Sequence, residues 1–178
     1  MRTRLAEPTD AAAMLAIWNP EVVETTVSFD LEPRTVAEQV AWIEGHRGPH
    51  PCLVALDDGD VGEPLANGER LLGFASLSRF REKPAYVTTA ESSISVHRDA
   101  RGKRVGERLL TDLLAAAKTS GFHSVIARIV GENRASIALH ERCGFRVVGT
   151  EVEVGRKHGQ WLDVIQYQYV VGGDARRG

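Results

Sequence analysis

The segment from residue 96 to residue 107 constrains this chain more than any other part of its sequence. It reads Val-His-Arg-Asp-Ala-Arg-Gly-Lys-Arg-Val-Gly-Glu, which predicts the end of a strand, a short basic loop and the start of a helix. The first N–H groups of a helix lack intrahelical acceptors and lie at the positive end of the helix dipole. With Arg101, Lys103 and Arg104 beside them, these groups predict a binding site for a ligand that carries phosphates.

Two common nucleotide-binding motifs are absent from the chain. It contains no Gly-Lys-Ser, no Gly-Lys-Thr and no GxGxxG, which excludes the P-loop and the dinucleotide fingerprint. The net charge of −2 argues against a nucleic-acid partner held by bulk charge. No apolar run approaches the roughly 20 residues of a membrane span, and the first residues lack the apolar segment of a signal peptide. We therefore expect a cytoplasmic protein with neither a nucleic-acid nor a membrane partner.

The two cysteines, Cys52 and Cys143, are far apart and are not in a metal-ligand spacing. This usage is typical of a reducing cytosol and predicts neither a disulfide framework nor a metal site. Cys143 is flanked by Arg142 and Gly144, and no general base is evident from spacing. Covalent catalysis through this thiol is therefore not expected.

Hydrophobic periodicity and turn residues predict the order β, α, α, β, β, β, α, β, α, β, β. This order gives a mixed sheet with helices on both faces. With 178 residues, 43% of them hydrophobic, the chain suits one domain over residues 1–171 and a flexible tail over 172–178. The seven predicted strands cover residues 2–5, 52–56, 70–77, 90–96, 124–130, 145–154 and 163–171.

The first two predicted helices are separated by an irregular segment. The first begins at Thr9 or Asp10, and Pro20 is expected to end it, so that residues 19–33 are irregular. A capping box from Thr35 to Glu38 opens the second helix. Its apolar face is expected to consist of Val36, Val40 and Ile43.

The other two predicted helices are better defined. Residues 106–120 carry an apolar stripe at helical spacing, and Gly121 supplies the stop. Asn133 is expected to cap a helix that ends at Cys143 and Gly144.

The last of these helices carries a second motif. Residues 133–145 read Asn-Arg-Ala-Ser-Ile-Ala-Leu-His-Glu-Arg-Cys-Gly-Phe, about thirty residues after the basic loop. The two motifs together resemble those of the GCN5-related N-acetyltransferases, which bind acetyl-CoA. The resemblance implies an α/β (α+β) fold: a mixed, mostly antiparallel central sheet of about seven strands, with splayed central strands. One departure is that Arg104 stands where the family has a glycine, which puts the detailed shape of the loop in question.

Within that superfamily the chain resembles the phosphinothricin and methionine sulfone/sulfoximine N-acetyltransferases. Residues 17–26, 89–96, 136–140 and 154–163 carry this resemblance. It implies direct acetyl transfer in a ternary complex to a small amino-acid-like amine, without a metal, by a homodimer with a role in detoxification. The substrate loop departs from the family: Phe80 and Arg81 are followed by Glu and Lys, where the family has Pro and Phe.

The resemblance also implies the residues of the site. Glu91 is the proposed base, although a carboxylate there can also orient the ammonium group or be structural. His140 is a candidate acid for the departing thiolate, and packing beside the cofactor is the alternative. The substrate residues are Arg81, Glu91, Ser92 and Ser93, where the Arg81 guanidinium suits an α-carboxylate or a sulfone oxygen. The acetyl-CoA residues are Ile94, Ser95, Val96, Gly102, Lys103, Arg104, Val105, Gly106, Glu107, Asn133 and Arg142.

Three side chains outside this set are expected to have ordinary roles. Trp42 and Trp161 are assigned to the core, and Lys157 to solvent, with a substrate or dimer contact as its alternative. Two other functions stay open. One is acetylation of a peptide N-terminus or another amine, and the other is a non-catalytic acyl-CoA sensor.

Overall fold

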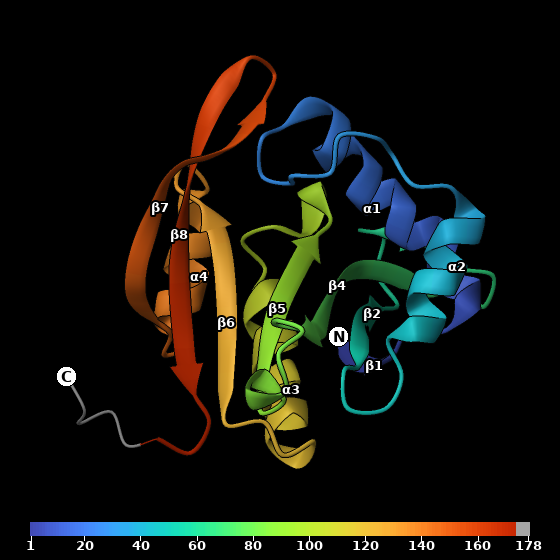
Figure 1. Cartoon of the computed structure of the whole chain (residues 1–178). Helices are drawn as coiled ribbons and strands as arrows, with labels where there is room; N and C mark the ends of the chain where they lie inside the picture. The colour runs from blue at the N-terminus through green and yellow to red at the C-terminus, as the bar shows by residue number, and fades with distance from the viewer. Residues whose placement is uncertain (174–178) are drawn as a thin grey trace.

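The computed structural model describes residues 1–173, and four helices flank its eight-stranded sheet (Figure 1). The order of strands is β1-β2-β4-β5-β6-β8-β7, with β3 paired to β4; only β5 and β6 are parallel. The strands are β1 (Arg2–Leu5), β2 (Cys52–Asp57), β3 (Glu63–Pro64), β4 (Arg70–Arg79), β5 (Thr89–Val96), β6 (Ser124–Val130), β7 (Arg146–Lys157) and β8 (Gln160–Val170). The helices are α1 (Ala11–Glu24), α2 (Val36–Gly45), α3 (Val105–Thr119) and α4 (Arg134–Arg142), with short 3-10 turns η1 (Pro8–Asp10), η2 (Pro84–Tyr86) and η3 (Arg98–Ala100).

This architecture confirms the predicted fold class. The sheet is mixed and mostly antiparallel, and it holds one strand more than expected because β3 lies inside the predicted 57–69 loop. The tail expected over residues 172–178 falls largely on residues 174–178, which lie outside the described part of the chain. Within residues 1–173, none of the helices has the length and apolar character that a membrane crossing requires.

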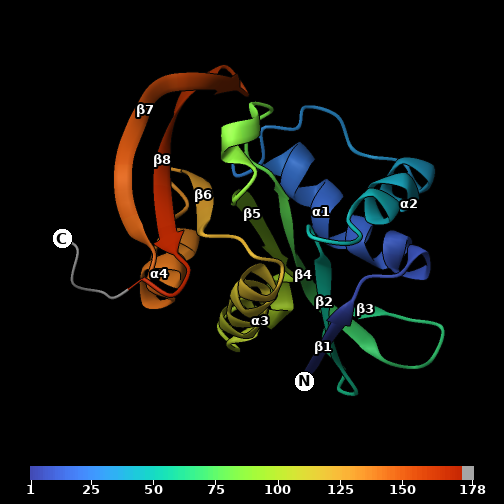
Figure 2. The same cartoon turned by 60° about the horizontal axis from the view of Figure 1, so that its bottom comes forward.

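The helices divide the core into two layers, one on each face of the sheet (Figure 2). On one face α3 buries Leu109, Leu110 and Leu113 against β4, β5 and β6, and side chains of α4 pack at the margin of this cluster. On the other face Met14 and Ile17 of α1 and Ile43 of α2 pack on β2 and β4. The predicted apolar stripe of α3 is confirmed, as is its stop at Gly121, which has φ +81°.

The expected break at Pro20 is wrong. Helix α1 continues through Pro20 to Glu24, although proline cannot donate the bond to the carbonyl four residues earlier. Ile17, Glu21 and Val22 form a buried stripe that spans the proline. Tertiary packing of this stripe offsets the lost hydrogen bond, since packing supplies most helical stability in proteins.

Helix α2 begins as predicted but packs differently. The Thr35 hydroxyl accepts from Glu38 N at 3.3 Å, and Thr35 N donates to the Glu38 carboxylate at 2.8 Å, which confirms the capping box. Val36, however, is exposed, so its assignment to the apolar face is wrong. Gln39 takes the buried position, where its side-chain amide donates to the Met14 sulfur at 4.0 Å.

The hairpin of β7 and β8 overturns two further expectations. Lys157 is only 5% exposed, and its Nζ donates to the carbonyl oxygen of Ser28 at 2.7 Å, so it is neither solvated nor an obvious substrate contact. Trp161 is 60% exposed and stacks with Arg156 instead of entering the core. The tip of the hairpin therefore rests on the α1–α2 loop, and the two lie side by side at the top of Figure 1.

Candidate active site

The centre of the site is the point where β5 and β6 separate. Their parallel pairing runs from Thr89↔Ser124 to Ser92↔Ala127 and then stops, although both strands continue. Beyond this point β5 stays paired with β4, and β6 stays paired with β8. The wedge opens toward the top of Figure 1, and it confirms the predicted splay of the central strands.

Backbone groups of β5 face this wedge. His97 N donates to Leu72 O at 2.8 Å, and bonds between antiparallel strands involve alternate residues. By this alternation the backbone groups of Ser93 and Ser95 point to β4, whereas those of Ile94 and Val96 point away from β4 into the wedge. An extended ligand with amide groups can pair there as an added strand would.

The basic loop after β5 forms a cradle of backbone amides. The first helical bond of α3 runs from Arg108 N to Arg104 O, so the amides of Val105, Gly106 and Glu107 have no helical acceptor. Gly102 has φ +76° and Arg104 has φ +61°. Arg104 thus adopts the left-handed conformation that favours glycine, the residue that stands at this position in the family's motif.

Two arginines of the same loop bind the first helix instead of facing the cradle. Glu21 of α1, only 7% exposed, accepts from Arg98 Nε at 3.0 Å and from Arg101 Nη2 at 2.9 Å. Glu24 also pairs with Arg98, at 2.7 Å. Lys103 and Arg104 are exposed, and Arg104 makes only a loose pair with Glu107 at 3.6 Å. The loop is therefore anchored at one end and carries exposed cations at the other.

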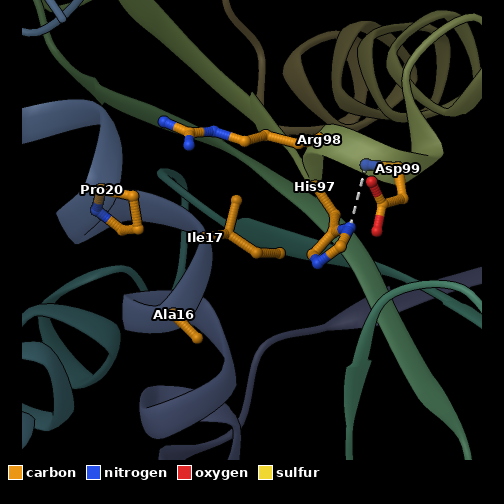
Figure 3. A pocket seen from close by; sticks show the side chains of 6 residues that line it. All are labelled: Ala16, Ile17, Pro20, His97, Arg98 and Asp99. Carbon is orange, nitrogen blue, oxygen red and sulfur yellow. Dashed lines mark hydrogen bonds between the residues drawn. The ribbon is translucent and has the colours of Figure 1, made fainter. Parts of the chain in front are cut away.

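A small hollow separates α1 from this loop. Figure 3 shows Ala16, Ile17 and Pro20 of α1 on one side of it, and His97, Arg98 and Asp99 on the other. The Asp99 amide donates to His97 Nδ1 at 3.2 Å. None of Glu91, Arg81 or His140 lines this hollow, so we place the reactive centre at the wedge between the strands.

Glu91 lies on β5 just before the wedge, opposite Ser78 of β4 and Ile126 of β6. Burial raises the pKa of this carboxyl group; the nearby charges of Arg128 and Arg81 lower it, and that of Glu151 raises it. A half-buried carboxylate with a raised pKa is suited to accept a proton near neutral pH.

Comparison with known proteins agrees with this geometry. The model of the acetyltransferase (GNAT) family matches residues 12–145. The chain belongs to this family. It is 38% identical over 161 residues to a phosphinothricin N-acetyltransferase of Streptomyces coelicolor, covering 89% of this chain and 90% of the relative. It is also 38% identical over 156 residues to an L-methionine sulfoximine/L-methionine sulfone acetyltransferase of Pseudomonas paraeruginosa, covering 87% and 86%.

A solved structure supports the assignment of the cofactor. The GNAT phosphinothricin acetyltransferase of Sinorhizobium meliloti, in complex with acetyl-CoA, superposes with a TM-score of 0.85 at 31% identity, covering 99% of this chain and 94% of that one. The chain described here is therefore an acetyltransferase that uses acetyl-CoA to acetylate an amine. The amide cradle and the exposed Lys103 and Arg104 fit such a ligand, as does the edge of β5 beyond Ser92, where Val96 O accepts a long hydrogen bond from Arg101 Nε at 3.4 Å. Within residues 1–173, no cluster of three or more His, Cys, Asp or Glu side chains could hold a metal.

In this acetyltransferase His140 lies inside the protein. It is 2% exposed, its Nδ1 lies 2.8 Å from Ser136 O, and its ring packs edge-on against Phe145. Burial lowers the pKa of the imidazole, so the ring is neutral at pH 7 and its proton sits on Nδ1, where it donates to that carbonyl. In this tautomer Nε2 is a hydrogen-bond acceptor, so an acid role would require the imidazole to be protonated first.

The remaining predicted residues are spread around the wedge. Asn133 Oδ1 accepts from Ser136 N at 3.1 Å, which confirms the cap of α4. Arg142 is exposed at the end of α4. Ser92 is buried and donates to Ile126 O at 3.3 Å, whereas Ser93 is exposed. Arg81 is exposed, and its guanidinium lies over the rings of Phe80 and Tyr86.

The contacts of three further residues were not predicted from the sequence. Glu21 and Lys157 contact segments 77 to 129 positions away, so no local pattern points to them. Arg128 belongs to a strand that reads as almost entirely apolar. A single charged residue inside that run was the only available signal. Burial raises the pKa of the Cys143 thiol, which is consistent with its exclusion as a nucleophile.

Proposed function

We propose that this enzyme transfers the acetyl group of acetyl-CoA directly to the α-amine of a small amino acid of the phosphinothricin or methionine sulfone type. The observation that carries this proposal is the position of Glu91, half-buried at the wedge between β5 and β6 with Arg81 and Arg128 near it. The names of the relatives support the class of acceptor.

In the proposed reaction each part of the wedge has one task. The amides of Val105, Gly106 and Glu107 hold the pyrophosphate, with Lys103, Arg104 and Arg142 as its cations. The wedge-facing backbone of Ile94 and Val96 pairs with the pantetheine amides. Asn133 lies near the pantetheine arm.

The chemical step starts with an ammonium group beside Glu91. Glu91 accepts a proton from it, directly or through water, and the neutral nitrogen attacks the thioester carbonyl carbon. A strand N–H stabilises the developing oxyanion. The carbon–sulfur bond then breaks, the thiolate leaves, and the second proton of the attacking nitrogen passes to it, directly or through water, to give the amide and the free thiol. Ser93 is at the acceptor face, and Ser92 supports the strand from behind. An acid role for His140 stays a prediction.

A panel of amines tests the proposal, with free thiol release as the readout. We expect turnover of methionine sulfone, methionine sulfoximine and phosphinothricin. Glu91→Gln should lower kcat by roughly 10²–10⁴ with little change in acetyl-CoA affinity. The exposed Glu44→Gln on α2 is the control. Turnover only of peptides would favour the N-terminal alternative, and acetyl-CoA binding without any turnover would favour a sensor. A cytoplasmic location, a homodimer and a detoxifying role stay predictions.

A further inference from the structure

Strand β6 presents one charged side chain on the acceptor face of the sheet. Glu91 pairs in register with Ile126, and paired residues of parallel strands share a face. Arg128 is two residues further along β6 and therefore lies on the same face as Glu91. Ala127, between them, packs in the α3 core on the other face. Arg128 is also the first residue of β6 beyond the last β5–β6 pair, so it stands at the mouth of the wedge.

The Arg128 guanidinium is paired with a carboxylate but remains partly exposed to solvent. It forms an ion pair with Glu151 of β7, and both side chains are about one-third exposed. A guanidinium has five N–H donors, so one carboxylate leaves part of the fork available to a second. The carboxylates of Glu91 and Glu151 both lie near Arg128, and an amino-acid acceptor would bring its α-carboxylate to the same region as a third negative charge. That third negative charge needs a cation at this position.

We propose that Arg128, paired with Glu151, binds the α-carboxylate of the acceptor amino acid. This rests on the proposed function, in which the α-amine lies at Glu91. A single carbon separates the amine from the carboxylate in an α-amino acid. Glu91 and Arg128 stand on adjacent strands, which lie about 4.8 Å apart, and are offset by two residues, so their long side chains can take the two ends of one amino acid. Arg81 then serves the sulfone, sulfoximine or phosphinate oxygens at the far end of the side chain.

The position of Arg81 agrees with this division of roles. Its guanidinium lies 5.0 Å from the centre of the Phe80 ring and 5.8 Å from that of Tyr86, in the exposed segment between β4 and β5. Arg81 therefore belongs to the rim of the site, whereas Arg128 belongs to the sheet that forms its floor. A residue at the rim suits the side chain of the amino acid, which varies between substrates. A residue at the floor suits the α-carboxylate, which all amino acids share.

Three acceptors distinguish the two arginines. Methionine sulfone has both groups, its carboxamide derivative lacks the α-carboxylate, and norleucine lacks the side-chain oxygens. Arg128→Gln should raise KM roughly tenfold to a hundredfold for methionine sulfone and norleucine, and leave KM for the carboxamide within about twofold. Arg81→Gln, the matched control, should raise KM for the sulfone and its carboxamide and spare norleucine. Arg128→Lys, which keeps the charge but not the fork, should give an intermediate KM for norleucine.

The outcomes separate this inference from the function on which it rests. If Arg128→Gln raises KM equally for the sulfone and its carboxamide, Arg128 does not bind the carboxylate and the inference is overturned. If the wild-type enzyme acetylates none of the three acceptors, the proposed function fails first. A rise in Tm with acetyl-CoA, measured in every variant, confirms that the variants are folded. Since Arg128 is partly exposed, Arg128→Lys remains informative if the Gln variant does not fold.

Discussion

At the scale of single residues, Arg104 is the clearest case of a position whose backbone conformation disagrees with its side chain. It has φ +61° in a loop where glycine would be relaxed, and its side chain is 84% exposed, so no packing holds it there. The left-handed conformation costs a non-glycine residue about 1–2 kcal/mol. This conformation of Arg104 directs the backbone amides at the start of α3 into the cradle.

Two substitutions separate the strain of Arg104 from its charge. Arg104→Ala and Arg104→Gly both remove the cation, but only glycine relieves the backbone. We expect the Gly variant to be about 1 kcal/mol more stable than the Ala variant, which is about 2–4 °C in Tm for a chain of this size. Thermal unfolding without ligand measures the difference. Equal Tm values would mean that residue 104 does not occupy the left-handed region.

Glu91 makes a second prediction at this scale, which concerns stability and pH. Because burial raises its pKa in the folded state, the folded protein binds more protons than the unfolded chain between the ordinary and the raised value. Stability should therefore fall as pH rises through that interval. Glu91→Gln, which cannot ionise, should be more stable than wild type at pH 8 and nearly equal at pH 4. Urea unfolding at the two pH values measures this, and a Gln variant that is less stable at pH 8 would contradict it.

At the scale of elements, the contact between α1 and the basic loop joins two segments about 77 residues apart. Glu21 is buried there under Arg98 and Arg101, so removal of its charge should loosen the loop. We expect Glu21→Gln to raise KM for acetyl-CoA several-fold, to leave KM for the amine nearly unchanged, and to cost about 1–2 kcal/mol of stability, because the arginines remain half-exposed. Steady-state kinetics and urea unfolding measure these effects.

Glu24→Gln is the matched control for this contact. Among residues 1–173 Glu24 pairs only with Arg98, and its side chain is largely exposed. It should change neither KM nor stability by a measurable amount. If Glu24→Gln and Glu21→Gln behave alike, the burial of Glu21 has no role in holding the loop.

At the scale of the whole molecule, local periodicity was sufficient for the order of elements but not for their contacts. The stripe of α3 and the caps at Thr35 and Asn133 follow from short-range spacing, and the structure has them all. Pro20 inside α1 and the burial of Lys157 depend on tertiary packing. The site divides in the same way. Glu91 and the loop belong to recognisable motifs, whereas Glu21 and Arg128 acquire a role only when distant strands and helices meet.

The homodimer is the prediction that belongs to this scale. Strand β7 is an edge of the sheet, and it exposes Val147, Val148, Val152 and Val154. An apolar edge strand is a surface that proteins usually cover, and we predict that a second copy of the chain covers it. We expect light scattering to give the mass of a dimer, and Val152→Lys to shift it toward the monomer. A wild-type protein that is monomeric at micromolar concentration would contradict this.

Strand β5 divides its residues between the two substrates. Even-numbered residues turn their backbone groups to the wedge where acetyl-CoA is proposed to lie, and odd-numbered residues present Glu91, Ser93 and Ser95 on the opposite face from α3. If Glu91 is the base, as proposed, its distance from the thioester is fixed by the geometry of one strand. An engineer could therefore rebuild residues 80–88 and the acceptor-facing side chains of β6 and β7 for a new amine. The position of Glu91 relative to acetyl-CoA would be unchanged. A one-residue insertion in β5, in contrast, would exchange the wedge-facing and acceptor-facing residues and abolish the reaction.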